Sequence, residues 1–86
     1  MDTKNLDTFI QVAELGSFTK AAEKLGCSQS TVSFQIKQLE NSLDIRLFER
    51  INHTVKITEQ GRQVLEYANS VNRLTQQMEK DLKGSA

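Results

Sequence analysis

The sequence predicts a small, mainly α-helical domain, and three observations support this fold class. Apolar residues recur at spacings of three and four through much of the 86-residue chain, which is the period of one face of an α-helix. Two helical stretches within residues 17–40 are joined by a tight turn at Gly26. Residues 47–58 hold two short β-prone runs. Together they predict three helices, a two-stranded hairpin and a final long helix.

The first two helices are predicted from apolar spacing and from glycines at their ends. Residues 3–15 carry an amphipathic pattern that Gly16 ends, so this helix should form one wall of the core. Either Ser17 or Thr19 can cap the second helix. Its adjacent small residues, Ala21 and Ala22, mark a place where another helix crosses closely, and Gly26 provides a left-handed end.

The third helix is predicted to begin after Ser28 and to have two different faces. Its core face consists of apolar residues that are four, three and four positions apart, namely Val32, Ile36, Leu39 and Leu43. Its opposite face carries short hydrogen-bonding groups, one aromatic ring and one cation, namely Gln29, Ser30, Thr31, Ser33, Phe34 and Lys37. Such side chains can reach base edges and phosphates, so two helices joined in this way predict a DNA-reading helix.

A wing and a long helix are predicted to follow. The β-prone runs at residues 47–50 and 55–58 are separated by residues 52–54 and predict a hairpin, although its turn has no Asn-Gly or Asp-Gly pair. Thr58 can cap a helix that continues to about Leu82, with Glu59 in its first turn. We therefore divide the chain into a winged helix-turn-helix at residues 1–58 and a linker helix at residues 59–86.

The final helix has an apolar stripe that is longer than a domain of this size can bury. The stripe consists of Val64, Leu65, Ala68, Val71, Leu74, Met78 and Leu82. At about 1.5 Å per residue the helix would be roughly 35 Å long. A second copy of the same helix is the natural cover, which predicts a symmetric homodimer. The predicted dimer-interface residues are Val64, Ala68, Val71, Leu74 and Met78.

Composition excludes several classes of protein. One Cys and one His leave no internal disulfide, no zinc cluster and no catalytic relay, so we expect neither an enzyme nor a cofactor. Cys27 is expected to be a small buried hydrophobe, with redox sensing as the alternative. No apolar run approaches the roughly 20 residues that span a bilayer, and the first four residues do not begin a signal peptide. A cytoplasmic protein without membrane contact is expected.

Net charge is zero, with 11 basic and 11 acidic residues, which argues against a nonspecific polycation. It still permits a DNA reader, because affinity depends on where the cations lie. The cations of the central segment are Lys20, Lys24, Lys37, Arg46, Arg50 and Lys56. A helical protein-interaction module is the competing interpretation, since the charge is balanced and Phe34 is not basic.

Taken in order, the motifs resemble the N-terminal DNA-binding domain of LysR-type transcriptional regulators. The resembling residues are Phe9 and Ala13, Gly16-Ser17-Phe18-Thr19 with Ala21-Ala22, Ser28-Gln29-Ser30 with Val32-Ser33, Gln35-Ile36 with Leu39-Glu40, Leu47-Phe48-Glu49-Arg50, and Thr58-Glu59-Gln60-Gly61. The resemblance implies a dimer that binds double-stranded DNA at an interrupted palindrome near a promoter. It also implies, for the complete regulator, a larger effector-binding domain, a small-molecule effector, contact with RNA polymerase and a possible tetramer.

Four residues depart from the family pattern. Ser30 stands where Pro is frequent, and Phe34 stands where Arg or another polar residue is frequent. Asp44 replaces the usual Gly before the wing, and His53 replaces Arg or Gly in the wing turn. DNA contact by the wing is therefore the part of the resemblance that transfers least directly.

The predicted DNA contacts fall into two groups. Base-reading residues are Gln29, Ser30, Thr31, Ser33 and Phe34. Gln29 could contact adenine through both amide atoms or bridge to phosphate, and Phe34 could read thymine methyls or fold back onto the core. Backbone-contacting residues are Thr19, Lys20, Lys37, Arg50 and His53, for which helix capping or a solvated charge is the alternative.

Overall fold

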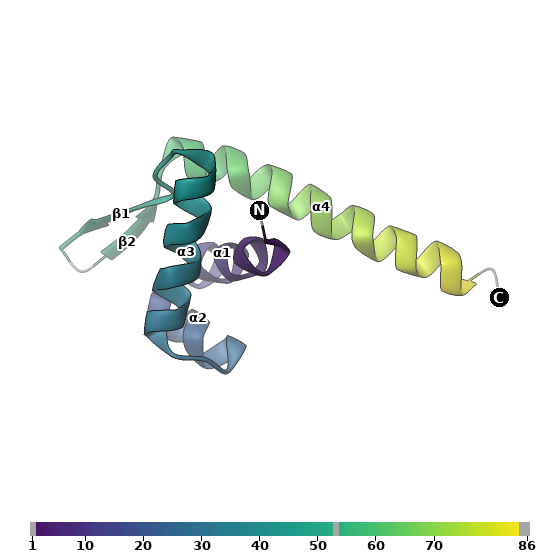
Figure 1. Cartoon of the computed structure of the whole chain (residues 1–86), viewed down its shortest axis with the longest axis horizontal. Coiled ribbons are helices and arrows are strands. Elements are labelled where there is room, and N and C mark those ends of the chain that lie inside the picture. Colours follow the sequence, from purple (N-terminus) through teal and green to yellow (C-terminus); the bar gives the residue numbers. More distant parts are fainter. Residues whose placement is uncertain (1, 53, 85–86) are drawn as a thin grey trace.

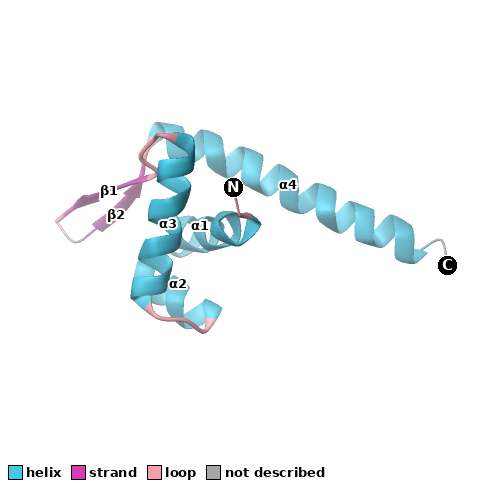
Figure 2. Cartoon of the chain, viewed as in Figure 1, coloured by secondary structure: helices cyan, strands magenta, loops and turns pink. Residues whose placement is uncertain are grey.

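The computed structural model describes residues 2–52 and 54–84. Its elements are α1 (Thr3–Leu15), α2 (Phe18–Leu25), α3 (Gln29–Leu43), β1 (Phe48–Ile51), β2 (Thr54–Ile57) and α4 (Glu59–Gly84). Helices α1 to α3 form one body, from which the β1–β2 hairpin and the C-terminal half of α4 extend in different directions (Figure 1). The expected order of three helices, hairpin and long helix is confirmed, as Figure 2 shows.

The helix ends follow local chain chemistry. Ser17 Oγ accepts a hydrogen bond from the Lys20 amide at 3.1 Å, so Ser17 and not Thr19 caps α2. Ser28 Oγ caps α3 in the same way, accepting from the Thr31 amide at 3.1 Å. Gly16 ends α1 at φ 64°, which is the left-handed conformation that glycine adopts without a Cβ penalty.

Asp44 ends α3 in the left-handed conformation as well, at φ 54°. A side chain in this conformation brings its Cβ close to a carbonyl oxygen, so the glycine that the resemblance implies here would adopt it more easily. Aspartate tolerates the conformation better than most residues, although at a cost. The departure from the family pattern at Asp44 is therefore a source of local backbone strain.

The wing is a two-stranded antiparallel sheet whose register pairs Phe48 with Ile57 and Ile51 with Thr54. It is shifted slightly from the predicted runs. Leu47 is fully buried and precedes the strand, because its carbonyl oxygen accepts the Thr58 amide hydrogen at 2.9 Å and anchors the base of the hairpin. Thr54, expected in the turn, begins β2.

The core lies between the three helices and the base of the wing. Phe9 and Val12 of α1, Val32 and Leu39 of α3, and Leu47 are all less than 2% exposed. Three phenylalanine rings then join the helices to the wing, since Phe48 of β1 lies 5.3 Å from Phe9 and 5.9 Å from Phe18 between ring centroids. Such aromatic pairs add to the stabilisation from area burial.

Two polar side-chain pairs tie α1 to α3. Thr8 Oγ1 donates to Gln35 Oε1 at 2.5 Å, and Asn5 Nδ2 donates to Gln38 Oε1 at 3.3 Å. Thr8 and Asn5 are both buried, so each requires its partner. Because a hydrogen bond demands defined geometry, these pairs add to the contacts that hold α3 against α1.

The start of α4 is locked to the wing. Thr58 Oγ1 accepts the Gly61 amide hydrogen at 2.9 Å, which confirms Thr58 as the cap of this helix. A Cβ on Gly61 would overlap the carbonyl oxygen of Leu47, so only glycine allows α4 to approach this closely. The first turns of α4 pack against α1, and the domain division at residue 58 stays a prediction.

Candidate nucleic-acid interface

The outer face of α3 is accessible over its first three turns. Gln29, Ser30, Thr31 and Phe34 are exposed and Ser33 is half-buried, while Val32, Ile36 and Leu39 point into the core. Gln29, Ser30, Ser33 and Phe34 thus share one side of α3. Thr31 instead borders a hollow beside α1, and its Oγ1 is hydrogen-bonded with Ser28 Oγ at 2.9 Å. Leu43, expected on the core face, is half-buried and packs against the edge of the core.

Phe34 is 61% exposed and does not fold back onto the core. An aromatic ring held in water is unfavourable, because burial of apolar surface is worth about 25 cal/mol per Å². The ring stands among polar neighbours on the accessible face of α3, where a base could cover it.

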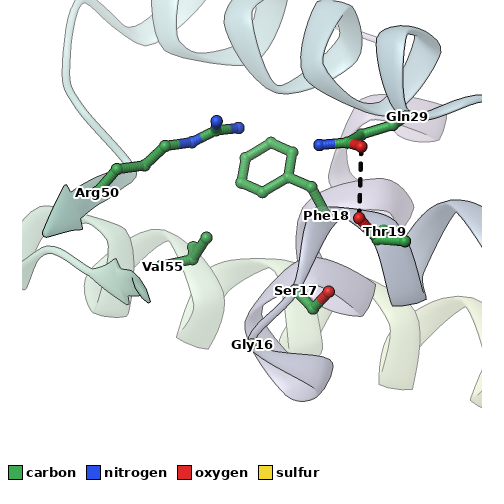
Figure 3. A pocket seen from close by; sticks show the side chains of 7 residues that line it. All are labelled: Gly16, Ser17, Phe18, Thr19, Gln29, Arg50 and Val55. Atoms are coloured by element: carbon green, nitrogen blue, oxygen red, sulfur yellow. Dashed lines mark hydrogen bonds between the residues drawn. The ribbon is translucent and has the colours of Figure 1, made fainter. Parts of the chain in front are cut away.

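The N-terminus of α2 lies beside the N-terminus of α3. Thr19 Oγ1 donates a hydrogen bond to Gln29 Oε1 at 3.3 Å, and both side chains are exposed. They border an open hollow that reaches the wing (Figure 3). The hollow is lined by Gly16, Ser17, Phe18, Thr19, Gln29, Arg50 and Val55.

Arg50 of β1 reaches this hollow from the other side. Its guanidinium carbon lies 4.5 Å from the centroid of the Phe18 ring, a cation–π contact that restrains the long side chain. Figure 3 shows the Arg50 guanidinium and the Gln29 amide approaching the Phe18 ring from opposite sides. The guanidinium is a charged hydrogen-bond donor, which suits a phosphate oxygen at the edge of this hollow.

A second hollow places three cations along the groove between α3 and the wing. Lys37 of α3, Arg46 of the connecting loop and Arg50 of β1 all line it. Glu40 lines it too, but its carboxylate accepts the Leu47 amide hydrogen at 2.7 Å and is partly committed to the fold. Arg46 was not among the DNA contacts predicted from the sequence, although its place among the cations of the central segment was a usable signal.

The structure describes one of the two remaining residues that were predicted to contact the DNA backbone. Lys20 is exposed in the first turn of α2, next to Thr19. His53 lies outside the described residues.

Within the part of the chain that the structure describes, no group of three or more His, Cys, Asp or Glu side chains could hold a metal ion. Cys27 is half-buried against the core and is a free cysteine.

The apolar stripe of α4 divides into a covered and an uncovered part. Ala68 is 1% exposed within one chain, and half-buried Val64 packs against the core. The assignment of Ala68 to a dimer interface stays a prediction, but its side chain is already buried within one chain. Val71, Leu74 and Met78 are 42, 71 and 54% exposed, so the uncovered part begins about two turns after Val64, the first residue of the predicted interface.

Three packed helices, an accessible third helix and a β-hairpin define a winged helix-turn-helix domain, here extended by a long C-terminal helix. Residues 3–62 match the model of the bacterial regulatory helix-turn-helix proteins of the lysR family. The chain therefore belongs to the LysR family of bacterial regulatory proteins. None of the described helices is apolar enough over sufficient length to cross a lipid bilayer.

Relatives and solved structures agree with this membership. The chain is 40% identical over 82 residues to the HTH-type transcriptional regulator HdfR of Salmonella newport (strain SL254), covering 95% of this chain. It spans only 30% of the length of that relative. Similar structures include the BenM_DBD/catB site 1 DNA complex (40% identity, TM-score 0.90, 96% of this chain and 93% of that chain). The CbnR_DBD–DNA complex is also similar (30% identity, TM-score 0.91, 99% and 98%).

Proposed function

We propose that this chain is the sequence-specific, double-stranded DNA-binding domain of a LysR-type bacterial transcriptional regulator. The observation that carries the proposal is the outer face of α3, where hydrogen-bonding side chains and one exposed ring stand on a rigid, capped helix. A major groove admits a helix of this kind. The similarity to structures titled as DNA complexes supports the same conclusion.

In this proposal α3 lies in the major groove as the recognition helix. Gln29, Ser30, Thr31, Ser33 and Phe34 face the base edges, while Thr19 and Lys20 of α2 face the sugar–phosphate backbone. Lys37 and Arg50 flank α3 and neutralise phosphates. His53 at the wing turn is proposed as a further backbone contact.

Binding is proposed to occur as a homodimer on an interrupted palindrome. Beyond Ala68 the exposed apolar residues of α4 recur at spacings of three and four, which suits packing against a second copy of α4. With 26 residues, α4 is about 39 Å long. This length is comparable to the roughly 34–36 Å between half-sites one helical turn apart.

The complete regulator is proposed to act in the cytoplasm and to have no catalytic role, since the relatives are named as transcriptional regulators. Binding of a small-molecule effector, contact with RNA polymerase and assembly into a tetramer are proposed only for that longer protein. The competing function, a winged module that binds only other proteins, is favoured by the balanced net charge.

Titration of labelled promoter DNA at several salt concentrations separates these two functions. DNA binding predicts that the logarithm of affinity falls with the logarithm of salt concentration, by about 0.9 for each neutralised phosphate. Absence of binding to any duplex at low salt would contradict the proposal and favour the protein-interaction module.

Lys37→Gln provides a sharper form of this measurement. Removal of one phosphate contact should reduce the salt slope by about 1 and weaken binding to all sequences by a similar factor. Lys80→Gln is the matched control, because Lys80 is an exposed lysine on the distal part of α4. An equal change of slope in both variants would show that Lys37 acts only through net charge.

A further inference from the structure

One side-chain hydrogen bond crosses the turn between α2 and α3. Thr19 lies in the first turn of α2, and Gln29 is the first residue of α3. The hydroxyl of Thr19 donates to Oε1 of Gln29 at 3.3 Å (Figure 3). The bond therefore links the helix that should follow the DNA backbone to the first side chain of the recognition helix.

This bond restrains the Gln29 side chain, and in the structure the amide has one orientation. Oε1 is turned toward Thr19, and Figure 3 shows the amide nitrogen on the other side of the group, toward Phe18. A glutamine side chain has considerable rotamer freedom when nothing restrains it. Threonine is β-branched and stiff at χ1, so Thr19 is a suitable fixed anchor.

An amide held in this way keeps hydrogen-bonding capacity for a ligand. Its oxygen has a second lone pair, and its nitrogen carries two hydrogens. In the major groove, adenine presents a donor at N6 beside an acceptor at N7, which matches the two ends of the amide. Guanine presents two acceptors, N7 and O6, and can satisfy only the nitrogen end.

We propose that Thr19 is a positioning residue that holds the Gln29 amide for recognition of adenine. The inference rests on the proposed DNA-binding function and identifies the base class that this part of the site reads. It assigns Thr19 an effect on base choice, whereas a phosphate contact by the same hydroxyl would change affinity for all sequences alike.

The test uses the whole chain and a duplex that this chain selects from a randomised pool. Each base pair of a half-site is replaced in turn, A·T by G·C and G·C by A·T, and the affinities are measured. The pair whose preference disappears in Gln29→Ala is the pair that Gln29 reads. The same duplexes are then titrated with Thr19→Val, which keeps the side-chain shape, and with Thr19→Ser, which keeps the hydroxyl.

Thr19→Val should reduce the preference for A·T over G·C at that pair by about 3- to 10-fold, within the range expected for one hydrogen bond. Thr19→Ser should retain the preference. In the Gln29→Ala background, Thr19→Val should cause no further change in preference, because the two residues act through one bond. Thr3→Val, an exposed substitution at the start of α1, is the matched control.

Three results would overturn the inference while leaving DNA binding intact. They are an unchanged base preference in Thr19→Val, an equal loss of affinity on every duplex, and a pair other than A·T at the position that Gln29 reads. If the pool yields no enriched sequence at any salt concentration, the proposed function itself fails. Thermal melting followed by circular dichroism verifies that each variant is folded, and Thr19→Ala should repeat the effect of Thr19→Val.

Discussion

Phe34 is the residue that most distinguishes the outer face of α3. Its ring is 61% exposed and stands between polar neighbours in sequence. The family resemblance implies arginine or another polar residue at this position. Arginine reads guanine through two hydrogen bonds, whereas an apolar ring contacts the C5 methyl group of thymine. At the residue scale, Phe34 should therefore shift the preferred operator away from that of its relatives.

Substitution of deoxyuridine for the thymine next to Phe34 tests this contact, since uracil lacks only the methyl group. Affinity should fall about 4-fold, because one buried methyl or methylene is worth about 0.8 kcal/mol. In Phe34→Ala the difference between thymine and uracil should disappear. Equal affinity of the unaltered chain for both duplexes would remove Phe34 from the base-reading set.

The exposed residues of the site could be predicted from the sequence where their placement depends only on nearby residues in the chain. The side chains of the outer α3 face follow from helical spacing, and their exposure agrees with the prediction, while their DNA contacts stay predictions. The Thr19–Gln29 bond and the Arg50–Phe18 contact join residues that only the packing of separate elements brings together. The Thr8–Gln35 hydrogen bond could not be predicted from the sequence either, because these residues meet only when α1 packs against α3.

At the element scale, the helix boundaries were predictable because caps are local. Gly16, Gly26 and Ser28 end or begin helices at the predicted places. The bounds of the wing strands were harder to predict from the sequence, since the strands are defined by pairing across the hairpin. Leu47, predicted in the first run, is buried in the core and precedes β1, whose pairing begins at Phe48 with Ile57.

The end of α3 contains a strain that one substitution should relieve. Asp44 has φ 54° and is the last residue before the loop to the wing. Asp44→Gly should stabilise the chain by about 0.5–1 kcal/mol, because glycine adopts this conformation freely and the change removes a negative charge from a helix C-terminus. Urea unfolding at a fixed protein concentration measures the difference.

Asp44→Ala separates the two causes. Alanine removes the same charge but keeps the Cβ, so this variant should gain less than Asp44→Gly or lose stability. Equal stabilisation by glycine and alanine would indicate that charge alone, without backbone strain, accounts for the effect.

At the scale of the whole molecule, α4 determines the shape. The chain measures 51 × 26 × 19 Å along its principal axes, and the distal part of α4 extends away from the helical body (Figure 1). The apolar stripe was visible in the sequence, but the point at which it leaves the monomer core was not. Only the packing of α1 on α4 shows that Ala68 is internal and that the exposed stripe begins near Val71.

Replacement of Val71 and Leu74 by aspartate should split the proposed dimer without unfolding the winged domain. Two charges in an apolar helix–helix interface are costly to desolvate, whereas both positions are exposed in the monomer. Sedimentation should show the mass of one chain, and DNA affinity should fall through lost bivalency.

Gln76→Asp with Lys80→Asp is the matched control. These exposed residues lie about half a turn around α4 from the stripe, and the double change adds at least as much negative charge. The control should remain dimeric. Unchanged mass in the Val71 and Leu74 variant would show that the interface lies elsewhere.

Selection of bound DNA from a randomised pool tests the central claim of sequence-specific reading by a paired domain most directly. The account predicts enrichment of two inverted half-sites, each contacted by one α3, with a fixed separation set by the α4 dimer. A pool that shows no enriched sequence, or that shows single half-sites without a fixed partner, would contradict it.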